Sequence, residues 1–153
     1  MMKNKRNYFA FSIFLILTVI CMILIFKFSS QSGEDSSGVS ISFYDIFLEI
    51  TGFDFINHDV FRKFAHFSEY AALGFCSFAT LFFYFNKTKK LISFIFCFLY
   101  AVSDEIHQFF VPERAGRFSD VLIDCSGSVL GILIFTLILI LFNKIRSSDR
   151  YLH

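Results

Sequence analysis

The chain has 153 residues, of which 56% are hydrophobic and 25 are phenylalanine, whereas ordinary globular domains are roughly 45–50% apolar. Its 14 basic and 13 acidic residues leave a formal charge of +1. Basic runs with interleaved aromatic residues on a polar scaffold are absent from the sequence, so nucleic-acid binding is not expected. The length fits a single domain over residues 1–153, and the apolar excess favours a membrane protein.

Four apolar stretches are candidate transmembrane helices, at about 8–28, 62–85, 91–109 and 120–142. A hydrocarbon core of roughly 30 Å needs about 20 helical residues. The first and last stretches are apolar over nearly this whole length, and the middle two reach it only if each carries a polar end at the water interface. The predicted fold class is therefore all-α, a polytopic membrane protein built as a four-transmembrane-helix bundle.

The first stretch, Tyr8–Phe28, has a second interpretation as a cleaved signal peptide, because basic residues precede it. Its apolar run is longer than the usual core of about 7–15 residues, and no small-residue cleavage motif follows. We therefore expect a retained helix.

The connection after this helix begins with a Ser- and Gly-rich segment and then becomes amphipathic. Phe43, Ile46, Phe47 and Ile50 recur at helical spacing, with acidic residues on the opposite face. This pattern predicts a short amphipathic helix in the first outer loop, lying either on the membrane surface or as a lid on the bundle.

Basic residues gather in three segments: before the first helix, between the second and third, and after the fourth. With four helices these segments share one side, which then holds nine of the 14 basic residues but one of the 13 acidic residues. Because Lys and Arg favour the cytoplasmic side, we predict that both termini are cytoplasmic and that segments 29–59 and 105–119 face outward. A three-helix alternative would divide the basic segments between the two sides.

Ionisable residues occupy the outward ends of the last three predicted helices, and on each helix they recur on one face. Charged groups within a membrane are costly and usually face the bundle interior, so these ends are expected to meet in one outward-facing pocket. Small residues at i and i+4, Gly127 and Gly131, would let helices approach closely there. The alternative is that these polar pairs only tie the helix ends together. The catalytic candidates are His66, Glu69, Asp104 and Asp124, and the binding candidates are Arg62, Tyr70, Glu105, His107, Gln108, Arg114, Arg117 and Asp120.

The segments "RKFAHFSEYAALG" and "SDEIHQFFVPERAGRFSDVLIDCSGSVLG", with "FSSQ" after the first helix, resemble the VanZ-like family of small membrane proteins. The matching pattern is R-x-x-A-H-F-x-E-Y-x-x-L-G, then D-E-x-x-Q-x-F, P-x-R, D-x-x-x-D and G-x-x-x-G. The resemblance implies a bacterial inner-membrane protein, and the family's namesake lowers sensitivity to teicoplanin-type glycopeptide antibiotics. The motif positions in this chain are Arg62, His66, Glu69, Tyr70, Asp104, Glu105, Gln108, Arg114, Asp120 and Asp124.

The pocket admits two functional hypotheses beside the structural one. A binding protein would hold an envelope lipid, a peptidoglycan precursor or a lipoglycopeptide, with the Arg residues at the rim. An enzyme would hydrolyse a lipid-linked envelope substrate, with His66 as general base or with a metal ion held by His66-x-x-Glu69 and Asp104-x-x-His107 pairs, as helical bundles do. Carboxylates and imidazole suit zinc, manganese or iron, so the metal and any other cofactor stay undetermined.

Overall fold

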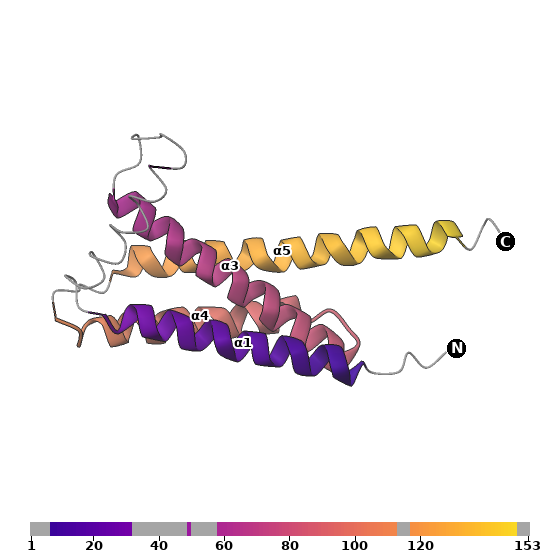
Figure 1. The fold of residues 1–153 in the computed structure, drawn as a ribbon, viewed down its shortest axis with the longest axis horizontal. Coiled ribbons are helices and arrows are strands. Elements are labelled where there is room, and N and C mark those ends of the chain that lie inside the picture. Colours follow the sequence, from indigo (N-terminus) through magenta and orange to yellow (C-terminus); the bar gives the residue numbers. More distant parts are fainter. Residues whose placement is uncertain (1–6, 32–48, 50–57, 113–116, 150–153) are drawn as a thin grey trace.

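The computed structural model describes residues 7–31, 49, 58–112 and 117–149. In chain order their helices are α1 (Tyr8–Ser29), α3 (His58–Phe85), α4 (Lys90–Gln108) and α5 (Phe118–Asp149). Successive helices run in opposite directions, so Ser29, His58, Gln108 and Phe118 lie toward the same end of the bundle, which we call the polar end (Figure 1). The described part of the chain therefore has the predicted all-α, four-helix arrangement.

The helix limits follow from local chemistry. The side chain of Asn7 caps α1 by accepting a hydrogen bond from the backbone N–H of Ala10 at 3.1 Å. After α3, Asn86 adopts a φ of 53°, the left-handed conformation that ends many helices and that Asn tolerates. At the other extreme, α5 continues past the predicted limit near residue 142 to Asp149, because no Gly or Pro follows to stop it.

Among the described residues, two helices are long and apolar enough to cross a membrane: α1, and α5 over Phe118–Ile145. Most of their large apolar side chains point away from the bundle and are exposed. Large continuous apolar surfaces of this kind mark membrane or protein contacts. The two helices thus support membrane insertion, whereas α3 and α4 combine apolar faces with polar ends.

The crossing of α3 and α5 depends on three glycines. A Cβ atom on Gly131 would collide with the backbone carbonyl of Ala71, and one on Gly127 would collide with that of Phe67. On the other helix, a Cβ on Gly74 would collide with the backbone of Ser128. The close helix approach predicted from the glycine spacing is therefore confirmed, and α3 packs against α5 more extensively than against the other helices.

Polar contacts join α1 to the other helices. The phenol of Tyr100 on α4 donates to the backbone carbonyl of Met22 at 2.6 Å, and the hydroxyls of Thr18 and Thr80 lie 3.2 Å apart across α1 and α3. Hence α1 packs as an integral member of the bundle. The predicted amphipathic segment of the first loop lies outside the described residues, apart from Glu49, which is exposed.

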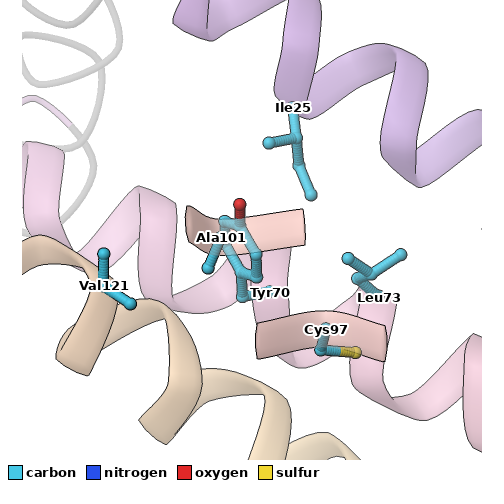
Figure 2. Close-up of a cluster of buried hydrophobic side chains, with 6 residues drawn as sticks. All are labelled: Ile25, Tyr70, Leu73, Cys97, Ala101 and Val121. Carbon is cyan, nitrogen blue, oxygen red and sulfur yellow. The ribbon is translucent and has the colours of Figure 1, made fainter. Parts of the chain in front are cut away.

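Two buried clusters fill the described part of the bundle. The first, nearer the polar end, takes side chains from all four helices (Figure 2): Ile25, Tyr70, Leu73, Cys97, Ala101 and Val121. The second, which we call the aromatic cluster, lies nearer the opposite end and combines Phe78, Ala79, Ile132 and Phe135 with partly buried rings that include Phe14, Phe75, Phe82 and Phe83.

Candidate functional site

Three candidate residues, each from a different helix, come together near the polar end. They are His66 of α3, Asp104 of α4 and Asp124 of α5, and each offers a ligand atom within 4.8 Å of the other two. We call this group the acid–histidine cluster. Apolar residues of the first buried cluster lie one helical turn away on each helix, namely Tyr70, Ala101 and Val121. Both aspartates are buried and His66 is half-buried, so most but not all of the cluster is withdrawn from the surface.

The two aspartates of the cluster are buried in different ways. Asp104 is 4% exposed, and its Oδ2 accepts a hydrogen bond from the Nε2 of Gln108 at 3.3 Å. Asp124 is 1% exposed, and among the described residues neither of its carboxylate oxygens has a hydrogen-bond partner. Buried polar groups are nearly always hydrogen-bonded. The carboxyl of Asp124 is an exception, and we expect its oxygens to bind a ligand.

The electrostatic surroundings of Asp124 are strongly acidic. The carboxylates of Asp104, Glu105, Asp120 and Glu69 all lie within electrostatic range of it. Like charges at short range in a poorly solvated site repel one another. The arrangement thus favours a positively charged group at its centre.

Tyr70 adds a hydroxyl beside these carboxylates. Its side chain is fully buried, its hydroxyl has no hydrogen-bond partner within the described ranges, and it lies within electrostatic range of Asp104 and Asp124. A buried phenol usually finds a partner, so this O–H is available as a donor to a ligand or to water in the site.

Glu105, the neighbour of Asp104, has a structural contact instead. It is buried, and its Oε2 accepts a hydrogen bond from the backbone N–H of Arg117 at 2.8 Å. A carboxylate near the first turn of a helix is favourable because of the helix dipole. Glu105 therefore fastens the end of α4 to the start of α5, while the side chain of Arg117 is exposed.

His107 lies apart from the cluster. Its ring stacks on Phe26 of α1 with centroids 4.9 Å apart, and its Nε2 lies 3.2 Å from the hydroxyl of Ser30. The expected i, i+3 pair of Asp104 and His107 thus does not converge on one point, because the two side chains face different neighbouring helices. Ser30 is not among the site residues predicted from the sequence, and only the motif "FSSQ" pointed to it.

The remaining candidates border the cluster or lie outside the described residues. Arg62 and Glu69 are half-buried on α3. Asp120 is half-buried at the start of α5, where its Oδ1 accepts a hydrogen bond from the hydroxyl of Ser119 at 3.1 Å. Arg114 falls in the segment 113–116, outside the described residues.

One half-buried imidazole and two buried carboxylates form a donor set suited to two kinds of chemistry. They can accept and release a proton, or they can hold a divalent cation. The Gln108 amide donates a hydrogen bond to Asp104, and the buried Tyr70 hydroxyl, which has no partner among the described residues, can donate another.

A scan against protein-family models matched one model, VanZ/LLP1, over residues 14–141. A search of curated proteins and a search of solved structures gave no significant match. The matched range begins within α1, runs through α3 and α4 and extends to Leu141 in α5, so it includes all three members of the acid–histidine cluster. Because the match spans most of the chain, the protein belongs to the VanZ/LLP1 family.

Proposed function

We propose that this protein is a multi-pass protein of the bacterial cell membrane, a single domain with both termini cytoplasmic and the polar end facing outward. There it binds or alters a lipid-linked envelope component, or a lipoglycopeptide itself, and so reduces sensitivity to teicoplanin-type antibiotics. The observation that carries the proposal is the acid–histidine cluster, in which two buried aspartates and a half-buried histidine from three helices meet at one end of a bundle whose outer surface is apolar. Such groups are expensive in a membrane and usually mark a functional site.

The distribution of charge supports the orientation. The connection between α3 and α4 lies at the end of the bundle opposite the polar end (Figure 1). It contains Lys87 and Lys89, and Lys90 begins α4. Basic residues in short connections favour the cytoplasm. Alkaline phosphatase fused after residue 153 should therefore be inactive, and green fluorescent protein at the same position should be fluorescent. The reverse pattern would refute the orientation.

The functional test is complementation in a bacterium that lacks its own homologue, with teicoplanin sensitivity as the readout and the membrane level of each variant quantified. We expect the wild type to protect, and His66→Gln, Glu69→Gln, Asp104→Asn and Arg114→Ala to lose protection at normal protein levels. Ser68→Ala and Ser126→Ala are matched controls, because each serine is exposed and its hydroxyl bonds to its own helix. If all four site variants still protect, the cluster only holds the helix ends together and has no role in resistance.

A second function, hydrolysis of a lipid-linked envelope substrate, is favoured by one observation. The imidazole of His66 lies close to two buried carboxylates, and such carboxylates orient an imidazole and stabilise its protonated form. His66 would then take a proton from water as the water adds to the phosphorus or the acyl carbon, and would return it to the alcohol that leaves as the ester bond breaks. An enzyme would lose turnover but keep substrate binding in His66→Gln, whereas a pure binding protein shows no turnover in the wild type.

A further inference from the structure

The acid–histidine cluster has the composition of a metal site. It combines one imidazole nitrogen with two carboxylates, supplied by α3, α4 and α5, with ligand atoms within 4.8 Å of one another. Ligands at about 2.1 Å from a tetrahedral ion lie about 3.4 Å apart. Small side-chain rotations suffice to close the difference.

Asp124 gives independent support, because it is a nearly completely buried carboxylate directed at the other two members of the cluster. Both of its oxygens lack hydrogen-bond partners among the residues described, although burying a polar group without a hydrogen bond is costly. The surrounding carboxylates add to the cost rather than relieve it. A divalent cation would offset the two aspartate charges and occupy the lone pairs of Asp124.

We infer that His66, Asp104 and Asp124 bind a divalent transition-metal ion, and that Zn²⁺ fits the donor set best. Zinc takes imidazole nitrogen and carboxylate oxygen together, and sites with three protein ligands leave a position for water or substrate. Magnesium prefers oxygen ligands and keeps several waters, which suits a site with an imidazole ligand and two buried carboxylates less well.

Neighbouring groups are placed to support the ligands. Gln108 donates to Oδ2 of Asp104, an arrangement that orients carboxylate ligands in metal sites. The buried hydroxyl of Tyr70 lies within electrostatic range of both aspartates and can donate to a carboxylate or to a bound water. The Glu105–Arg117 contact fixes α4 against α5 beside the site.

This inference deepens the proposed function, since it names the ion at the same site, but it does not require that the protein protect against teicoplanin. Zinc binding is measured on the purified full-length protein in detergent, whereas the proposed function is measured in cells. Zinc binding without protection would refute the proposed function alone, and protection without zinc binding would refute the metal site alone.

The first experiment is calorimetric titration of chelator-treated wild type with Zn²⁺, repeated with Mn²⁺ and Mg²⁺. We expect one Zn²⁺ per chain and weaker binding of Mg²⁺. His66→Gln, Asp104→Asn and Asp124→Asn should each weaken zinc binding more than about 100-fold, and Gln108→Leu by about 10–100-fold. The exposed neighbours Ser68, Ser103 and Ser126 supply matched controls as alanine variants, with unchanged affinity. A wild type that binds no Zn²⁺, or ligand variants that bind like the wild type, would overturn the inference.

Thermal unfolding separates a metal ligand from a structural aspartate. Zinc at about 100-fold above its Kd should raise the wild-type Tm by roughly 5–10 °C and leave the Tm of Asp124→Asn unchanged. In chelator no such difference is expected: Asp124→Asn replaces a buried carboxyl that has no hydrogen-bond partner among the described residues, and it should melt no lower than the wild type. If Asp124→Asn melts well below the wild type in chelator, or fails to fold, while zinc has no effect on the wild type, Asp124 is structural and the inference fails.

Discussion

The two ends of the bundle are built on different physical principles. At the aromatic cluster, Phe135 lies within 5.2–6.3 Å, centroid to centroid, of five other phenylalanine rings, and no ionisable residue is needed. At the polar end, buried acids and a histidine approach one another and Asp124 has no hydrogen-bond partner within the described ranges. One end thus stabilises the bundle, and the other retains Asp124, a buried carboxyl that is costly unless a ligand binds it.

Both ends depend on the close crossing of α3 and α5, so the largest effect is expected there. Gly131→Leu would place a side chain against the backbone of Ala71 and Phe75, and backbone atoms cannot move aside as a flexible side chain can. We expect loss of folded protein from the membrane fraction, with protection lost in parallel, measured by size-exclusion chromatography of a fluorescent fusion.

The matched control is Ser126→Leu, which adds the same side chain to the same helix at an exposed position. It should fold like the wild type. If Gly131→Leu gives a normal monodisperse peak, the helices do not cross as closely as described.

The next effect in size separates stability from site chemistry. Phe135→Ala removes the ring shared by the aromatic cluster and should lower the free energy of unfolding by about 3 kcal/mol. This value is at the low end for buried phenylalanines, because helices separated in a membrane still have apolar surroundings. The change is measured by denaturation in mixed micelles. Phe142→Ala, at an exposed position of the same helix, should have little effect.

The folded fraction of Phe135→Ala should still bind zinc, since the ring lies far along α5 from Asp124. Loss of zinc binding by this folded variant would show that the two ends are not separable.

These comparisons also show how far the sequence could predict the structure. The length of the apolar runs predicted the helices, and the spacing of Gly127 and Gly131 predicted the close crossing. The direction of His107 was not predictable. A residue three positions after Asp104 is rotated by about 300° around the helix axis, and periodicity alone does not say which neighbouring helix lies on that side.

The polar contacts of α1 with the other helices could not be predicted either, because a single hydroxyl in an apolar run does not indicate which residue it contacts. The bond from Tyr100 to the carbonyl of Met22 depends on the rotation of two helices about their axes. Such rotations are set by packing along the whole interface. The extension of α5 to Asp149 was missed because the prediction followed hydrophobicity, whereas a helix continues into water when no residue stops it.

An intermediate effect on stability should distinguish Glu105 from Asp124, two buried acids of the polar end. Glu105 accepts a hydrogen bond from the backbone of Arg117, so Glu105→Ala should lower the free energy of unfolding by about 2 kcal/mol, the range for hydrogen bonds to charged groups. Glu105→Gln keeps an acceptor oxygen and should recover most of this loss. Asp124→Asn should show no such destabilisation in chelator. The free energy of unfolding is measured by denaturation in mixed micelles. If Glu105→Ala and Asp124→Asn lower it equally, Asp124 stabilises the fold as Glu105 does and is not distinguished as a ligand residue.

The smallest effect concerns the hydroxyl contact between Thr18 and Thr80. Each hydroxyl has one hydrogen, and each also lies 2.8 Å from a carbonyl of its own helix, that of Phe14 or Cys76. The hydrogen of each hydroxyl is therefore mostly donated to the carbonyl of its own helix. A hydrogen bond between the two hydroxyls, which lie 3.2 Å apart, would have to replace one of these bonds. A double-mutant cycle of Thr18→Val and Thr80→Val should give a coupling free energy of about 0.6 kcal/mol for unfolding. Thr136→Val, whose hydroxyl bonds within its own helix, is the control. A coupling above about 1.5 kcal/mol would mean that α1 is held by polar contacts, rather than mainly by packing.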